Sequence, residues 1–222
     1  MGYSKRLKIL FSHLKRADTF ADVGCDHGYA TEYALKNGLC KTAVFSDISK
    51  GSLQKAERLL KDYVEQKVAT PVLGDGFFGV PKTVEQVLIA GMGGSEIVGI
   101  LSDEKYGFLP ELFVFQPMKD SEKLRKYLLE NGGYIERDYT FEDGKYYDVI
   151  CGRKRRGEEK QEYSALELEF GKENIALKPE AFQKRMKKLL ADIDGYLQNG
   201  KVSRESQEEL LSRKRRISEA LQ

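Results

Sequence analysis

Short apolar segments alternate with longer amphipathic segments through the first 130 residues, and this alternation restricts the fold more than any other feature of the chain. The apolar segments, which predict strands, are residues 20–24, 41–46, 68–73, 86–90 and 112–115. The amphipathic segments, which predict helices, are residues 4–16, 29–36, 49–63, a stretch that ends near residue 101, and residues 120–130. Strands separated by helices are expected to run parallel, in a sheet that helices cover on both faces.

The end of the predicted sheet departs from this alternation. Residues 134–141 and 145–151 are both strand-like, and only Glu142-Asp143-Gly144 joins them, which is too short for a helical crossover. The two segments predict an antiparallel hairpin, so one strand of the sheet runs backwards. The expected fold class is therefore α/β with a Rossmann-like sheet, and the terminal hairpin resembles that of the class I methyltransferases, which use S-adenosylmethionine.

The composition is that of a soluble globular protein, because 41% of the 222 residues are hydrophobic and 32% are charged. No apolar stretch reaches the length of a membrane span, and the basic N-terminal segment lacks a secretory core, so we expect a cytoplasmic protein with no membrane partner. Cys25, Cys40 and Cys151 form no CxxC pair and predict neither a metal site nor a disulfide.

The segment DVGCDHGYAT at residues 22–31 runs from the first predicted strand into the loop after it, where Rossmann-like sheets bind ligands. Asp26 stands where a dinucleotide-binding loop has its second glycine, and a carboxylate is unfavourable beside a pyrophosphate. S-adenosylmethionine has no phosphate but carries an ammonium group, for which Asp22 and Asp26 are candidate acceptors. Gly24 and Gly28 would let the backbone approach this cofactor, and His27 would line the same pocket. Helix capping and turn formation are the alternative roles of the two acidic residues.

Acidic residues also follow the next two predicted strands. Asp47 can accept hydrogen bonds from both ribose hydroxyls of the cofactor, while Ile48 can pack on its adenine. Asp75 can accept a hydrogen bond from the adenine amino group, with Gly76 offering a backbone contact. Because parallel strands end at one edge of a sheet, we expect these residues to share one site with the loop at residues 22–31. Forming a turn is the alternative role of Asp75.

The fourth predicted strand ends in the glycine-rich segment AGMGG, residues 90–94. Many nucleic-acid amino methyltransferases have an Asn/Asp-Pro-Pro-aromatic turn here, and this chain does not. We expect Ala90 and Gly91 to contact the cofactor and Gly93 to let a flat base approach, with Gln116-Pro117 as the opposite wall. A close strand-to-helix turn without substrate contact explains these glycines equally well.

Positive charge is concentrated in the last third of the chain. Residues 1–150 contain 20 Lys and Arg against 22 Asp and Glu, a net charge of −2, whereas residues 151–222 contain 17 against 13, a net charge of +4. The most basic runs are residues 153–156 and 213–216. Such runs either bind nucleic-acid phosphates or form solvated surfaces.

Apolar residues recur at helical spacing after Pro179 and again after Gln198-Asn199-Gly200, which predicts an antiparallel helical hairpin. We expect its outward cations to contact RNA phosphates, and they are Lys184, Arg185, Lys187, Lys188, Arg213, Lys214, Arg215 and Arg216. We expect a monomer, although such a hairpin can also self-associate. The predicted domains are residues 1–155, which bind the cofactor, and residues 156–222, a connector and the basic hairpin.

The segments SKRL, ADVGCDHGY, DGF, IAGMGG and QPM, followed by a basic helical tail, together resemble the bacterial TrmK family of tRNA (adenine-N1)-methyltransferases. The resemblance spans nearly the whole chain. It implies methylation of N1 of adenine 22 in tRNA, with S-adenosylmethionine as cofactor, S-adenosylhomocysteine as product and a C-terminal coiled-coil-like helix pair. Met118 departs from the family pattern, in which a polar residue such as Asn ends the QPM segment.

Adenine N1 has an in-plane lone pair and attacks a methyl group without prior deprotonation, so the site has mainly to align an unpaired base and exclude water. The candidate catalytic residues are Asp26, Tyr29 and Met92. The candidate substrate-binding residues are Arg6, Gly93, Gln116, Pro117, Arg213, Lys214, Arg215 and Arg216. Two alternatives stay open: a catalytically silent S-adenosylmethionine-binding RNA module and an NAD-dependent oxidoreductase.

Overall fold

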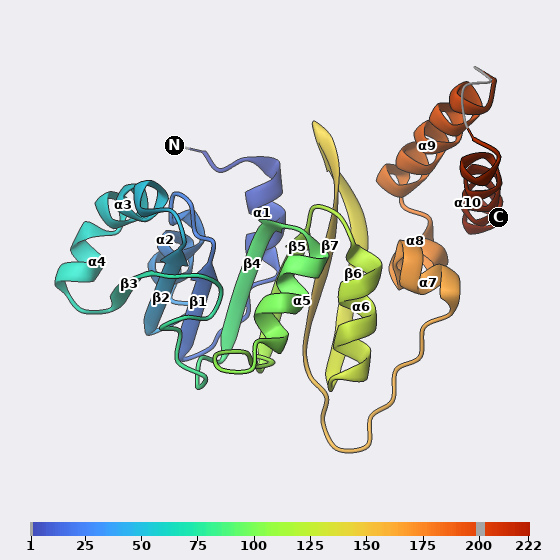
Figure 1. The fold of residues 1–222 in the computed structure, drawn as a ribbon. Helices are drawn as coiled ribbons and strands as arrows, with labels where there is room; N and C mark the ends of the chain where they lie inside the picture. The colour runs from blue at the N-terminus through green and yellow to red at the C-terminus, as the bar shows by residue number, and fades with distance from the viewer. Residues whose placement is uncertain (1, 199–202) are drawn as a thin grey trace.

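The computed structural model describes residues 2–198 and 203–222, and its centre is a seven-stranded β-sheet (Figure 1). In the spatial order β3-β2-β1-β4-β5-β7-β6, its strands are β1 (Thr19–Val23), β2 (Thr42–Asp47), β3 (Ala69–Leu73), β4 (Gln86–Met92), β5 (Leu112–Pro117), β6 (Gly133–Asp143) and β7 (Lys145–Lys154). Strands β1 to β5 run parallel, and β7 runs antiparallel to its neighbours β5 and β6. The mostly parallel sheet with one reversed strand is therefore confirmed.

Helices cover both faces of this sheet (Figure 1). They are α1 (Lys5–Ser12), α2 (Tyr29–Lys36), α3 (Lys50–Leu59), α4 (Lys61–Glu65), α5 (Gly94–Ser102) and α6 (Ser121–Glu130). Helices α1 and α2 share a core with Phe20 of β1, whereas α5 and α6 share another with Ala21 of β1. Successive side chains of a strand point to opposite faces, so the two cores lie on opposite sides of the sheet.

Two helices differ from their predicted bounds. Helix α1 ends at Ser12, and the ring of the next residue, His13, hydrogen-bonds the Tyr139 hydroxyl of β6 at 2.8 Å. The single helix predicted at residues 49–63 is divided at Leu60 into α3 and α4. Leu60 is fully buried, and its Cδ1 lies 3.1 Å from where a Cβ on Gly28 would be, so the break packs the chain under the loop after β1.

The C-terminal part contains four helices among the described residues, α7 (Ala165–Phe170), α8 (Lys172–Leu177), α9 (Glu180–Gln198) and α10 (Arg204–Leu221). Helices α9 and α10 lie side by side and share a core that includes Phe182, Met186 and Ile217 (Figure 1). The turn predicted at Asn199-Gly200 lies outside the described residues. The sequence predicted no secondary structure for the segment between the sheet and α9, and in the structure this segment contains α7 and α8.

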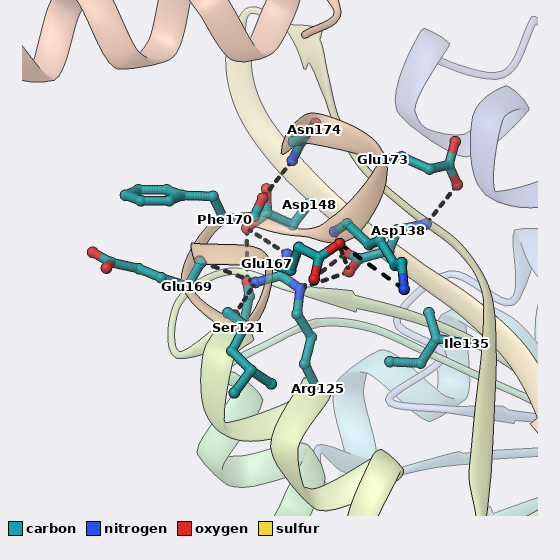
Figure 2. A network of polar contacts seen from close by, with 12 residues as sticks. Ser121, Arg125, Ile135, Asp138, Asp148, Glu167, Glu169, Phe170, Glu173 and Asn174 are labelled. Atoms are coloured by element: carbon teal, nitrogen blue, oxygen red, sulfur yellow. Dashed lines mark hydrogen bonds and ion pairs between the residues drawn. The ribbon is translucent and has the colours of Figure 1, made fainter. Parts of the chain in front are cut away.

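A buried ion pair fastens α7 to the sheet (Figure 2). The side chain of Arg125 in α6 is completely buried, and its Nε donates to both carboxylate oxygens of Asp138 in β6 at 2.9 Å. Its Nη1 donates to the carbonyls of Leu168 and Glu169 at 3.0 and 3.1 Å, which are unpaired acceptors at the end of α7. The chain then turns at Gly171, where φ is +98° and a Cβ would lie 2.9 Å from Asp138.

Within residues 2–198 and 203–222, no helix is both long and apolar enough to span a membrane. The same residues contain no group of three or more His, Cys, Asp or Glu side chains placed to bind a metal ion. Cys25, Cys40 and Cys151 are all buried and form no disulfide.

Candidate active site

A cavity of about 490 Å³ opens at the carboxyl ends of β1, β2 and β4, where a parallel sheet normally binds its ligand. It brings together most of the predicted site residues, namely Arg6, Asp22, Gly24, Asp26, His27, Tyr29, Asp47, Ile48, Asp75, Gly76, Ala90, Gly91 and Met92. A second cavity of about 710 Å³ adjoins it and shares Ile48, Asp75, Gly76 and Met92. Phe78 and Tyr106, which the sequence analysis did not predict, line this second cavity.

Two glycines of the first loop have different roles. Gly24 has a φ of +73°, and a Cβ there would overlap the terminal methyl group of Met92, so the loop needs glycine at the cavity wall. Gly28 also has a positive φ of +75°, but it does not line the cavity. A Cβ on Gly28 would lie 2.9 Å from the Cβ of Ala56 in α3. In the structure Gly28 therefore packs against α3 and does not line the cavity in which we expected it to contact the cofactor.

Asp22 is a buried carboxylate in the cavity wall, with 5% of its surface exposed. Burial raises its pKa from 3.8 to about 7, against the effect of the Thr31 hydrogen bonds, and the charge of Asp47 raises it further. The Thr31 hydroxyl donates to Asp22 at 3.1 Å. No ion pair among the described residues includes Asp22, so a cationic ligand group in the cavity would stabilise its charge.

Asp47 organises the loops on both sides of it. One of its carboxylate oxygens accepts a hydrogen bond from the backbone N–H of Asp26 at 3.0 Å, and the other accepts from the N–H of Ser49 at 2.8 Å. Each oxygen keeps a further lone pair for a ligand hydroxyl. The next residue, Ile48, is 71% exposed and lies between the two cavities, which leaves a large apolar surface available to a flat ring.

Arg6 forms the wall on the side of β5. Its Nε donates to Gln116 Oε1 at 2.7 Å, and its backbone N–H donates to Asp143 at 2.8 Å. A Cβ on Gly91, which has a φ of +84°, would lie 3.2 Å from Arg6 Nη2. Gln116 is completely buried and reaches the cavity only through Arg6. Among the substrate-binding residues predicted in the sheet domain, Gly93, Gln116 and Pro117 line neither cavity.

Some cations of the two basic runs form ion pairs within the protein, and others do not. In the first run, Arg153 pairs with Glu159 at 2.8 Å and with Glu136 at 3.2 Å. In the second run, Arg216 pairs with Glu169 at 2.6 Å and Lys214 pairs with Asp194, whereas Arg213 and Arg215 pair with no described residue.

Arg185 also departs from the expected arrangement. Its guanidinium does not point outward from α9 but reaches Asp148 of β7 at 2.7 Å. The hairpin therefore offers fewer cations to a partner than helical spacing alone suggested.

The residues of the two cavities fit S-adenosylmethionine. A buried carboxylate without a cation suits an ammonium group, and the exposed side chain of Ile48 suits an adenine. The carboxylates of Asp47 and Asp75 suit hydroxyl and amino donors. The hydroxyl of Ser46, which also lines the cavity, is buried and has no hydrogen-bond partner among the described residues. Acidic walls of this kind are unfavourable for a dinucleotide pyrophosphate.

Comparisons with known proteins point in the same direction. The family model described as "Methyltransferase domain" matches residues 3–150, which contain both cavities. The tRNA (adenine(22)-N(1))-methyltransferase of Bacillus subtilis is 29% identical over 171 residues, or 76% of this chain and 71% of that protein.

Solved structures share the fold over the full length of the chain. The crystal structure of the B. subtilis m1A22 tRNA methyltransferase TrmK has a TM-score of 0.86 and 22% identity, covering 100% of this chain and 99% of that one. The structure of M. capricolum TrmK in complex with S-adenosylhomocysteine has a TM-score of 0.85 and 21% identity, covering 98% and 96%. At these identities the likeness shows a common fold, and it includes the C-terminal helices.

Proposed function

This chain belongs to the methyltransferase-domain family, and from that premise we propose that it transfers a methyl group from S-adenosylmethionine to N1 of adenine 22 in tRNA. The family resemblance of its sequence motifs is confirmed by the similarity to the B. subtilis tRNA (adenine(22)-N(1))-methyltransferase together with the methyltransferase-domain match over residues 3–150. The relative from B. subtilis supplies the substrate class.

One observation supports the proposal most directly. Three acidic side chains, at the ends of β1, β2 and β3, line two adjoining cavities. Asp22 would hold the ammonium group of the cofactor, and Asp47 would accept its ribose hydroxyls. Asp75 and Ile48, which line both cavities, would hold the adenine. When bound there, S-adenosylmethionine supplies an electrophilic methyl group on its sulfonium.

The chain itself has to present an unpaired adenine and keep water away. Adenine N1 needs no general base, so no side chain has to remove a proton before the transfer. Arg6, whose guanidinium ends between Gly91 and Gln116, would hold the base or its phosphate beside the cavity. Tyr29 and Met92, which also line the cavity, would shape the base pocket.

The C-terminal hairpin would bind the phosphate backbone of tRNA. The exposed cations of the hairpin that form no ion pair with a described residue are Lys187, Lys188, Arg213 and Arg215. We place the division between the catalytic domain and the hairpin part at residues 155 and 156. We also propose that the protein acts as a monomer in the cytoplasm, where its tRNA substrate is found.

Incubation with unmodified tRNA and S-adenosylmethionine tests the activity, with the methylated nucleotide mapped by nuclease digestion. One methyl group at adenine 22 is the expected result. Cofactor binding without transfer would instead indicate a silent RNA-binding module. Thermal stabilisation by NAD but not by S-adenosylhomocysteine would contradict the assignment of the cavity.

Replacing Asp47 with Ala is expected to weaken S-adenosylhomocysteine binding by roughly 1 to 3 kcal/mol. The change removes an acceptor for the ribose and leaves the backbone N–H groups of Asp26 and Ser49 without their partner. Isothermal titration calorimetry measures the effect, with Asp62→Ala as a control at an exposed acid of α4. Unchanged affinity in Asp47→Ala would show that Asp47 only caps α3.

Replacing Asp26 with Ala is expected to reduce turnover while folding and cofactor affinity are retained. Asp26 lines the cavity, has a φ of +46° and keeps its side chain 65% exposed toward solvent, where an incoming base can reach it. Its backbone contact to Asp47 does not need the side chain. Methylation rates at saturating tRNA measure the effect, and rates equal to wild type would remove Asp26 from the active site.

A further inference from the structure

Asp148 is a buried carboxylate that joins three elements of the structure. It is 7% exposed, and it accepts hydrogen bonds of 2.7 Å from Ser121 of α6, Thr140 of β6 and Arg185 of α9. Burial alone would raise its pKa, but Arg185, Arg125 and the two hydroxyls outweigh burial and hold the pKa below its ordinary value. Asp148 is therefore ionised, and Arg185 is the cation that the C-terminal hairpin contributes to it.

Ser121 connects Asp148 to the loops at the catalytic edge of the sheet. It begins α6 directly after the loop that follows β5. The backbone N–H of Gly94, at the start of α5, donates to the carbonyl of Lys119 in that loop at 2.7 Å. A Cβ on Gly94 would overlap the carbonyl oxygen of Asp120, so the loops after β4 and β5 are in direct contact. Because Ser121 directly follows Asp120, its position is tied to both loops.

A second cation of the same network, Arg125, lies near Asp148 (Figure 2). Nη2 of Arg125 is buried, has no hydrogen-bond partner among the described residues and lies 4.0 Å from Asp148 Oδ2. Breaking a buried ion pair is costly mainly because a charge is left unpaired. Asp148 would keep Arg125 beside it in the absence of the Arg185 guanidinium, so a variant at Arg185 should not leave a buried carboxylate without a cation. The contact of Arg125 with Asp138 has no such replacement.

We propose that Arg185 is a positioning residue for methyl transfer, which acts through Asp148 and Ser121 to hold the hairpin in register with the loops at the substrate end of the cavity. The inference rests on the proposed function, since it concerns tRNA held by the hairpin. Methyl transfer requires near-linear alignment, and a misplacement of about 1 Å can cost about 100-fold in rate. A hairpin that holds the tRNA phosphates therefore needs a defined link to the loop that follows Met92, the last residue of β4.

Steady-state methylation of a tRNA transcript tests the inference. Arg185→Ala is expected to lower kcat about tenfold or more, while KM for tRNA and Kd for S-adenosylhomocysteine change less than about threefold. Arg185→Lys should recover most of kcat, because an ammonium group can still pair with Asp148. Ser121→Ala should lower kcat similarly. The double variant should be no slower than the slower single variant, since the two substitutions interrupt the same connection through Asp148. Lys126→Ala, at an exposed cation on α6, is the control and should match wild type.

Other outcomes would overturn the inference in distinguishable ways. A raised KM with unchanged kcat in Arg185→Ala would show that Arg185 binds phosphate instead. A wild-type kcat in Ser121→Ala would show that Asp148 and Ser121 do not couple Arg185 to the loops. This result is decisive even if Arg185→Ala fails to fold. Absence of tRNA methylation by the wild-type protein would refute the proposed function, and the positioning role with it.

Discussion

Replacing Asp22 with Asn is expected to weaken S-adenosylhomocysteine binding at pH 8 by about 2 to 3 kcal/mol, or roughly 30- to 150-fold in Kd. Asn has nearly the same size and can still accept the Thr31 hydrogen bond of 3.1 Å. It has no charge to balance the ammonium group of the ligand. Isothermal titration calorimetry measures the loss, and Asp62→Asn at an exposed position of α4 serves as the control.

The same substitution is expected to stabilise the ligand-free protein. Burial raises the pKa of Asp22 from 3.8 to about 7, so the folded protein holds a proton between these values that the unfolded chain has lost. The favourable contribution of Asp22 is therefore complete below pH 3.8 and is lost as the pH rises through about 7. At pH 8 the buried carboxylate is ionised, and Asp22→Asn should raise the free energy of unfolding by up to about 4 kcal/mol.

Urea denaturation at pH 8 and pH 5 measures this gain, which should be smaller at the lower pH. Ligand affinity provides an independent readout. In the wild type it should fall by up to about tenfold per pH unit below pH 7, because Asp22 must lose its proton before it pairs with an ammonium group. Asp22→Asn should lack this dependence. A variant that is no more stable than wild type at pH 8 would show that Asp22 is solvated in the ligand-free cavity.

The strands and their direction could be predicted because each follows from local pattern. The reversed strand β7, for example, follows from a three-residue connection that no helix could fit. Helix ends were less predictable, since Leu60 interrupts a continuous helical pattern in order to pack beneath Gly28. Helices α7 and α8 have six residues each and carry little periodic signal. A usable signal was the Ser164-Glu167 capping box, whose spacing is visible in the sequence.

The acidic residues of the site could be predicted because each lies at or just after the carboxyl end of a strand, and these ends share one edge of a parallel sheet. Side-chain partners could not be predicted in this way. Gly28 has the positive φ of a ligand-binding loop, yet the space it leaves is filled by Ala56. Phe78 and Tyr106 meet in an edge-to-face contact with ring centroids 5.3 Å apart, although they are distant in sequence. Helical spacing likewise predicted which residues share a helix face with Arg185, but it could not predict the ion pair of Arg185 with Asp148.

Removing the hairpin, residues 179–222, is expected to lower tRNA affinity by about 100-fold or more, because several phosphates would lose their cations together. The sheet and both cavities precede the deletion, so cofactor affinity should be unchanged. Some stability should be lost, since Phe182 and Met186 of α9 cover Phe170 of α7 and Arg185 pairs with Asp148. Filter binding, calorimetry with S-adenosylhomocysteine and thermal denaturation separate the three effects.

A narrower test divides the run at residues 213–216 by its ion pairs. Arg213→Ala with Arg215→Ala should reduce the slope of log affinity against log salt by about 0.9 for each phosphate that is no longer neutralised, without a change in stability. Lys214→Ala with Arg216→Ala should mainly loosen the hairpin, because these two side chains already pair with Asp194 and Glu169. Equal slopes in both double variants and the wild type would make the whole run a solvated surface. The sheet domain would then have to bind the RNA. In α1, Arg6 lines the cavity, and Lys5 and Lys8 are next in the chain to residues that line it.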